Sequence, residues 1–300
     1  MNNKIISTVL LILCAIIWGF AFVAQTSGMD HMGPFGFSAI RSIIGGLSML
    51  AIHPLLNKIN KDSDFSIDKA QTRRASLICG PILFFAMNLQ QYSLLYTSTG
   101  KAGFITTLYI IIIPVMRGFM GVKISKKMIF CIIGSTIGLY LITVKENLSI
   151  NIGDVMVFVS AVFYSVHTLL LADFSPRVDA IILNAYQFLI CGFMSAIPMV
   201  IFEGINSNAV AQSIGSILYV GILSSAFAYL FQIIGLRNVD PTIASLILSL
   251  ESIFAIIGGF FILNQTLTLR ETLGCLIMLI STIAVQIPLD FFKKKVLKKS

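Results

Sequence analysis

Ten runs of apolar residues, each about 20 residues long, occupy almost the whole of this 300-residue chain. A helix of about 20 residues crosses about 30 Å of hydrocarbon, so each run is long enough to span a membrane. The runs cover residues 5–25, 36–56, 75–95, 102–119, 128–144, 154–172, 181–202, 214–235, 242–263 and 272–291. Charged residues make up only 11% of the chain, whereas they are about a quarter of a soluble protein. The sequence therefore predicts an all-α polytopic membrane protein.

The chain also repeats itself, with a register of about 146 residues. The hexapeptide that starts at Ala15 aligns with the one that starts at Ala161, and Ser38 to Arg41 aligns with Asn184 to Gln187. Each copy holds five runs, and because five is odd the second copy crosses the membrane in the opposite direction. We expect ten transmembrane helices in two inverted five-helix repeats. Their predicted extents are residues 1–145 and 146–292, followed by a basic tail at 293–300.

The positive residues predict the orientation of the chain. If the N-terminus is cytoplasmic, 17 of the 21 Lys and Arg residues lie on the cytoplasmic side, which leaves Arg41, Lys101, Lys145 and Arg270 for the other side. The positive-inside rule thus accounts for the net charge of +8 without a nucleic-acid partner. We expect both termini in the cytoplasm and the lipid bilayer as a partner of the basic tail. The Ile-, Lys- and Asn-rich composition is typical of a bacterial protein of the plasma (inner) membrane.

One acidic residue, Glu251, lies near the middle of a run, the ninth. A charged side chain at mid-membrane costs about 2.5–3.5 kcal/mol on insertion scales, so an ionisable residue there is a candidate functional residue. A carboxyl group held away from water can take up and release a proton during transport. The structural alternative is a hydrogen bond that ties the ninth helix to a neighbour. Glu251 is therefore the candidate coupling residue.

Three other polar side chains inside runs, Arg41, Gln187 and His167, are candidate site residues. Arg41, about six residues into the second run, can reach the membrane interface, pair with Glu251 or bind a substrate carboxylate. Gln187 replaces Arg41 in the second repeat, which favours a cavity position for both. His167 lies three residues after Tyr164, on the same helix face. With no second ligand spacing in the chain, His167 is a candidate for hydrogen bonding in a cavity, and no metal site is expected.

Aromatic and amide residues complete the candidate set. Trp18, the only tryptophan, aligns with Tyr164 in the second repeat, so this pair either lines a cavity or packs in the core. The third run holds Asn88, Gln90 and Gln91, and buried amides need partners, either on other helices or on a solute. The candidate cavity residues are Trp18, Arg41, Asn88, Gln91, Tyr109, Tyr164, His167, Gln187 and Gln232.

Three stretches of the chain are similar to the EamA-type carriers of the drug/metabolite transporter superfamily. They are Thr97 to Tyr109 followed by Pro114, Trp18-Gly19-Phe20, and Ser249 to Ala255. The resemblance implies a ten-helix inverted-repeat carrier whose cavity is lined mainly by spans one to four and six to nine. It also implies that spans five and ten pack outside this cavity. Such carriers move small metabolites, including amino acids and related compounds, and often move them outward.

The chain departs from the family pattern at two places. Similar proteins usually carry a Glu shortly after spans four and nine, where this chain reads Val122-Lys123-Ile124-Ser125 and Leu263-Asn264-Gln265-Thr266. We therefore assign no role to a carboxylate at these helix ends.

We expect a secondary transporter of a small organic metabolite that works by alternating access, with export favoured and Glu251 available for proton coupling. The alternative within transport is an uncoupled facilitator. Outside transport, the alternatives are an intramembrane lipid-modifying enzyme that uses His167 and Glu251 as acid and base, and a non-transporting sensor or scaffold.

Several motifs are missing from the sequence. No GxxxxGK[ST], HExxH or GxSxG motif is present, and the five cysteines are scattered one to a run. We therefore expect no enzyme activity, no catalytic residue, no cofactor and no ATP-binding subunit. A small-molecule substrate is the expected partner; a single chain suffices for the site, and a dimer is compatible with it.

Overall fold

The computed structural model describes residues 2–59, 68–143, 150–204, 207–263 and 268–287, and these residues form only helices and turns. The first half contains α1 (Asn2–Met29), α2 (Pro34–Ile59), α3 (Lys69–Ser93), α4 (Thr99–Thr107), α5 (Tyr109–Phe119) and α6 (Lys126–Thr143). The second half contains α7 (Ile152–Phe174), α8 (Ala180–Pro198), η1 (Met199–Glu203), α9 (Ser207–Gln212), α10 (Ile214–Leu218), η2 (Tyr219–Ala228), α11 (Tyr229–Gly235), α12 (Pro241–Leu248), α13 (Glu251–Leu263) and α14 (Leu269–Gln286). The two η segments are π-helices. The predicted boundary at 145/146 and the tail at 293–300 lie outside the described residues.

Within the described residues, nine segments are long and apolar enough to cross a membrane. The third predicted run corresponds to α3, which has 25 residues and is therefore also of spanning length. Its hydropathy is low because basic residues (Lys69, Arg73 and Arg74) lie in its first two turns and amides (Asn88, Gln90 and Gln91) in its last two. The prediction of an all-helical, multi-pass membrane protein is confirmed.

Contacts between helix ends establish the directions of the two halves. The end of α1 lies beside the end of α3, where Gln91 Nε2 donates to Met29 Sδ at 2.5 Å. A short turn joins α3 to α4, and the start of α4 meets the start of α7 through an ion pair between Lys101 and Asp154 at 2.6 Å. The first helix of the second half therefore begins where the first helix of the chain ends, so α1 and α7 run in opposite directions.

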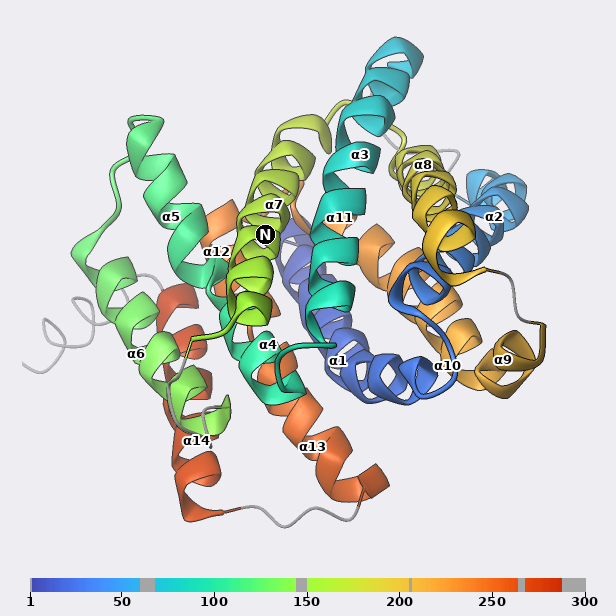
Figure 1. The fold of residues 1–300 in the computed structure, drawn as a ribbon. Coiled ribbons are helices and arrows are strands. Elements are labelled where there is room, and N and C mark those ends of the chain that lie inside the picture. Colours follow the sequence, from blue (N-terminus) through green and yellow to red (C-terminus); the bar gives the residue numbers. More distant parts are fainter. Residues whose placement is uncertain (1, 60–67, 144–149, 205–206, 264–267, 288–300) are drawn as a thin grey trace, which may run out of the picture.

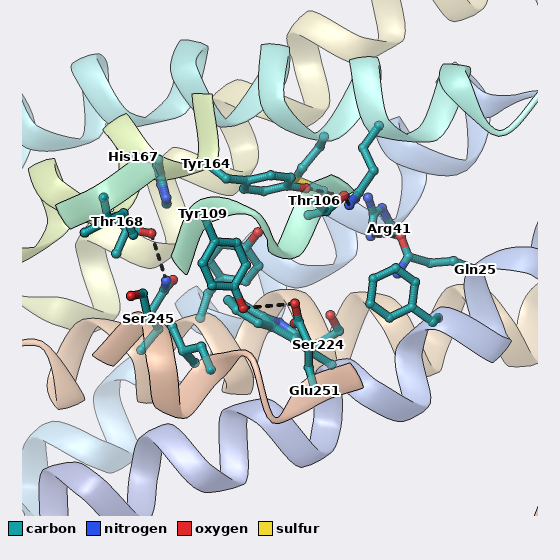
Figure 2. Close-up of a pocket in the computed structure, with 18 residues that line it drawn as sticks. Gln25, Arg41, Thr106, Tyr109, Tyr164, His167, Thr168, Ser224, Ser245 and Glu251 are labelled. Atoms are coloured by element: carbon teal, nitrogen blue, oxygen red, sulfur yellow. Dashed lines mark hydrogen bonds between the residues drawn. The ribbon is translucent and has the colours of Figure 1, made fainter. Parts of the chain in front are cut away.

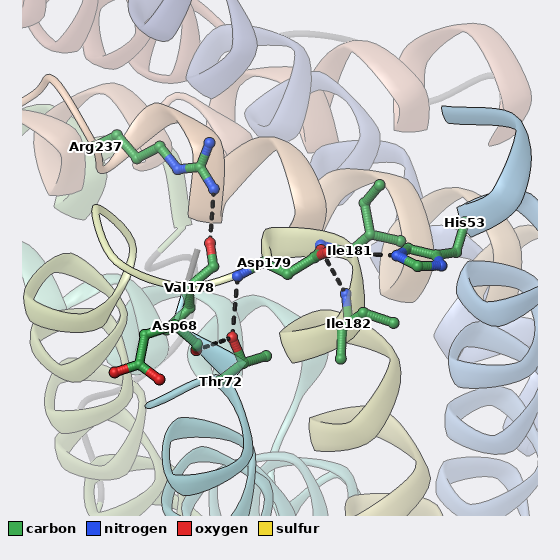
Figure 3. A network of polar contacts seen from close by, with 8 residues as sticks. All are labelled: His53, Asp68, Thr72, Val178, Asp179, Ile181, Ile182 and Arg237. Atoms are coloured by element: carbon green, nitrogen blue, oxygen red, sulfur yellow. Dashed lines mark hydrogen bonds and ion pairs between the residues drawn. The ribbon is translucent and has the colours of Figure 1, made fainter. Parts of the chain in front are cut away.

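The end of the bundle at which α1 begins is called the basic end. It carries Arg117, Lys123, Lys126, Lys127, Arg177 and Arg237. His53, in the last turns of α2, pairs with Asp179, the N-cap of α8, at 3.3 Å, and the Asp179 N–H donates to Thr72 Oγ1 at 3.1 Å (Figure 3). Arg237 reaches the connection between α7 and α8, where Nη2 donates to the Val178 carbonyl at 3.1 Å. This network ties helices of both halves together at the basic end.

Helices α6 and α14 pack against each other at one edge of the bundle (Figure 1). They approach most closely at Gly138 and Gly274. A Cβ atom on either glycine would lie 2.6 Å from the carbonyl oxygen of the other, closer than van der Waals contact allows. The close approach of these two spans therefore requires glycine on both.

The fourth and ninth spans are each broken near the middle, a departure from the continuous runs predicted at 102–119 and 242–263. The breaks lie at Leu108, between α4 and α5, and at Ser249-Leu250, between α12 and α13. At both breaks the backbone forms tighter i to i−3 bonds, such as Leu108 N to the Ile105 carbonyl at 3.2 Å. Backbone disruption of this kind is tolerated in a membrane protein where the segment is buried within protein or faces a cavity.

Candidate functional site

The two breaks meet across the interface between the halves. Tyr109 Oη donates to Glu251 Oε1 at 3.0 Å, and Thr107 Oγ1 lies 3.4 Å from Ser252 Oγ. Beside this crossing lies a cavity of about 70 Å³ (Figure 2). A cavity needs about 10–15 Å³ of volume to hold one water molecule, so this cavity has room for a small solute.

Residues of both halves line this cavity. Seven of the ten predicted site residues are among them: Trp18, Arg41, Tyr109, Tyr164, His167, Gln232 and Glu251. Among the described residues, neither α6 nor α14 contributes a lining side chain. These two helices are spans five and ten, so their position agrees with what the family resemblance implies.

Glu251 lies at the first residue of α13, where the break in the ninth span turns its side chain into the cavity. Only 4% of the residue is exposed. Its carboxylate accepts a hydrogen bond from the hydroxyl of Tyr109, which comes from the corresponding break in the first half, and the Thr107 hydroxyl at the same break also interacts with it. Glu251 is the one carboxylate among the described lining residues.

Arg41 lies in the first half of α2 and is 4% exposed, so its side chain does not reach the surface of the described structure. Nη1 donates to Gln25 Oε1 on α1 at 3.3 Å, and the guanidinium lies over the Phe37 ring with its carbon 5.7 Å from the ring centroid. Nε is buried and has no hydrogen-bond partner. No ion pair joins Arg41 to Glu251, although both line the cavity.

His167 lines the cavity and contacts Gln187 of α8, which in turn bonds to Asn184 of the same helix. Its Nε2 lies 3.0 Å from Gln187 Oε1, and Gln187 Nε2 donates to Asn184 Oδ1 at 2.9 Å. Gln187 is thus outside the lining, although its counterpart in the first repeat, Arg41, is part of it. Within the described part of the chain, no three His, Cys, Asp or Glu side chains are grouped to hold a metal ion.

The amides of α3 point in three directions. Asn88 Nδ2 donates to Ser195 Oγ on α8 at 2.7 Å, and Gln91 contacts the end of α1 through Met29, so neither lines the cavity. The intervening Gln90 does line it, donating from Nε2 to Thr106 Oγ1 at 2.8 Å and accepting from Tyr164 Oη at 3.1 Å. Asn88 and Gln91 therefore bond between helices, the first of the two roles that the sequence left open.

Some lining residues were not predicted from the sequence. Gln25, Thr106, Ser224 and Tyr229 all face the cavity. Gln25 could have been found as the one amide in the first run, but its place at the end of that run is also typical of an interfacial residue. Small hydroxyl residues and a single tyrosine inside an apolar run carry no signal that separates them from packing residues.

Charged contacts between the halves flank the cavity at both ends of the broken fourth span. At the start of α4, Lys101 pairs with Asp154, which also accepts from Thr97 Oγ1 at 2.5 Å. At the end of α5, Arg117 Nη1 donates to Asp240 Oδ1 at 2.5 Å. These two contacts hold the fourth span to the second half at opposite ends of the bundle.

A helical membrane protein with a cavity between two oppositely directed halves, lined by charged, polar and aromatic side chains of both, is the class that the fold and the site define. The chain belongs to the EamA-like transporter family, whose model matches residues 5–144 and again 151–286. This family is part of the drug/metabolite transporter superfamily and is a transporter family, not an enzyme family.

Similar proteins occur in archaea, bacteria and plants. An uncharacterized transporter of Archaeoglobus fulgidus is 25% identical over 278 residues, which are 92% of this chain and 84% of that protein. The uncharacterized transporter YoaV of Bacillus subtilis is 23% identical over 274 residues, 89% of this chain and 92% of its own length. A chloroplastic WAT1-related protein of Arabidopsis thaliana is 25% identical over 289 residues, covering 90% of this chain and 67% of that protein.

A solved crystal structure has the same fold. It superimposes with a TM-score of 0.78 at 15% identity, over 93% of this chain and 96% of the other.

Proposed function

We propose that this protein is a secondary transporter that moves a small organic metabolite, an amino acid or a related compound, by alternating access. The observation that carries the proposal is the cavity at the crossing of the two broken spans, because its lining combines residues of both halves. Substrate sites between repeats and beside discontinuous helices are typical of secondary transporters. We propose that the protein lies in the plasma membrane of a bacterium, functions as a single chain, and exports its substrate.

The two ends of the cavity differ in how well the lining residues are buried. At the basic end, the lining residues Ile113 and Leu248 are buried, and the contact between Arg117 and Asp240 lies beyond them. Toward the other end, the lining residues of α1, such as Phe22 and Gln25, are half-buried. In this proposal the described conformation is closed at the basic end, which the positive-inside rule assigns to the cytoplasm together with both termini.

Glu251 is the proposed proton-coupling residue. Its position supports this role, because a single buried carboxyl group faces the solute space where the two halves cross. The second candidate function, an uncoupled facilitator, is favoured by the bond from Tyr109, which gives Glu251 a structural task in joining the two breaks.

The test is flux of a pooled panel of amino acids and related metabolites into proteoliposomes. Ser245→Phe adds a ring to a buried lining position, whereas Thr272→Phe adds the same ring to an exposed position of α14. We expect flux of at least one compound in the wild type and in Thr272→Phe, and loss of that flux in Ser245→Phe. Flux in all three that equals the leak of protein-free vesicles would contradict a transport function.

A further inference from the structure

Arg41 is a buried cation without a counter-ion among the described residues. Its described hydrogen bond is to the neutral side chain of Gln25, and its Nε has no partner at all. A buried charge without a partner is strongly destabilising, and buried donors in folded proteins are nearly always bonded. An unpaired guanidinium that opens into a cavity therefore marks a place where an anion completes the structure.

Glu251 does not supply that negative charge. It accepts from Tyr109 at 3.0 Å, and the described ion pairs of the chain do not join it to Arg41. Figure 2 shows Arg41 beside Gln25 at one end of the cavity and Thr168 with Ser245 at the other, while Glu251 lies between them. The positive charge is thus localised at one end of the solute space.

We infer that the cavity binds a small organic solute with a single carboxylate, which lies on the guanidinium of Arg41. The inference rests on the proposed function and names the substrate class of the same site. The free Nε and the Nη groups of a guanidinium form a planar fork that matches the two oxygens of a carboxylate. Arg41 is the one Lys or Arg among the described lining residues, so a phosphate dianion would leave a negative charge uncompensated.

Trp18 provides a built-in probe of this site. It is the only tryptophan of the chain, it lines the same cavity, and its Nε1 is buried without a hydrogen-bond partner. The fluorescence of the purified full-length protein therefore reports on solute entering the cavity, whether or not transport follows. We would titrate it with propionate, lactate and benzoate, each beside its neutral amide (propionamide, lactamide and benzamide), and with inorganic phosphate. N-acetyltryptophanamide in solution corrects for quenching by the compounds themselves.

The expected result is a saturable change for at least one carboxylate, with its amide binding at least about tenfold more weakly. Arg41→Gln should weaken that carboxylate about 10- to 100-fold, the range for losing hydrogen bonds to a charged group. Arg41→Lys keeps the positive charge but lacks the planar fork, so its affinity for the carboxylate should lie between those of the wild type and Arg41→Gln. Arg177→Gln, which removes an exposed arginine paired with Asp173, is the matched control and should bind like the wild type.

A second variant keeps the inference testable if Arg41→Gln fails to fold. Gln25 Oε1 is 3.3 Å from Arg41 Nη1, so Gln25→Glu places a carboxylate of the protein itself on the guanidinium. The resident carboxylate competes with the added one, so Gln25→Glu should weaken carboxylate binding about tenfold or more while leaving Arg41 in place. Unchanged binding in this variant would contradict the inference.

The outcomes separate this inference from the proposed function. Equal responses to carboxylates and amides, no response to any carboxylate, or a stronger response to phosphate would each overturn the carboxylate assignment. Flux measured in parallel with the same compounds tests transport separately. Flux of neutral or cationic compounds alone, insensitive to Arg41→Gln, would leave a transporter and refute the carboxylate site. Arg41-dependent binding without flux of any compound would support the site and contradict the transport function.

Discussion

Replacement of Glu251 with Gln is predicted to abolish solute accumulation driven by a pH gradient while leaving solute exchange intact. Gln is close to Glu in size and retains an oxygen that can accept the bond from Tyr109, so the contact between the two broken spans persists. What it loses is the ability to change charge. The variant therefore separates the proposed proton carrier from the structural role that favours a facilitator.

The size of the effect follows from the number of carboxyl groups in the cavity. Glu251 is the one carboxylate among the described lining residues, so it can carry at most one proton in each transport cycle. One pH unit is worth about 1.4 kcal/mol for each proton, which corresponds to about a tenfold concentration ratio of solute. We expect about tenfold accumulation per pH unit in the wild type and none in Glu251→Gln.

The assay is accumulation in proteoliposomes that hold a pH difference of about one unit, using the compound that gives the highest flux in the panel. Exchange of labelled for unlabelled solute at equal pH controls for folding. Tyr109→Phe is the matched neighbour, because it removes the hydrogen bond but keeps the carboxyl group, and it should retain coupling. Accumulation by Glu251→Gln would refute the reasoning, and so would about a hundredfold ratio in the wild type, which requires two protons.

Three further predictions concern contacts between the helices. Gly138→Leu forces α6 away from α14 and should lower the free energy of unfolding by about 1–3 kcal/mol in thermal denaturation; an unchanged midpoint would mean that the close contact is unimportant. Arg117→Gln breaks the contact with Asp240 at the basic end and should destabilise the closed state by about 1 kcal/mol. A cysteine placed in the cavity by Ser245→Cys should then react with maleimide about fivefold faster. Equal rates would show that this contact does not hold the cavity closed. Glu203→Gln weakens the carboxylate cap that accepts from the first N–H groups of α2 at 2.7 and 2.9 Å and should cost about 1 kcal/mol in the same denaturation assay; a stabilised variant would contradict the capping role.

The fold could be predicted because few solutions exist for this composition. A run of about 20 apolar residues satisfies its own backbone in lipid only as a helix, so counting runs also counts spans. Because each half has five spans, an odd number, the two halves must run in opposite directions across the membrane. The breaks at Leu108 and Ser249-Leu250 could not be predicted, because neither site holds a Gly or Pro and Pro114 lies six residues further along. The two breaks are in contact, through Thr107 and Ser252, so they depend on tertiary packing.

The site was predictable to the extent that membrane burial makes polar side chains conspicuous. Glu251 and Arg41 stand out because an ionisable residue inside an apolar run is costly and therefore rare. The direction in which each side chain faces is harder to predict from the sequence. Successive residues are rotated by about 100° around the helix axis, and the packing of neighbouring helices determines which of them face the cavity. For this reason the sequence analysis selected Asn88 and Gln91 as cavity candidates, neither of which lines the cavity, and left out Gln90, which does.

The π-helix η2 makes the two halves mechanically different. Span eight contains ten residues of this wide helix, including the lining residue Ser224, whereas its counterpart in the first repeat, α3, is described as α-helix throughout. A π-helical turn accommodates an extra residue, so shifting it along the span rotates the residues that it passes without breaking the helix. We expect span eight to change shape by such a register shift, whereas α3, its counterpart in the first half, moves as a rod. The inward-open and outward-open states would then not be mirror images, despite the repeat in the sequence.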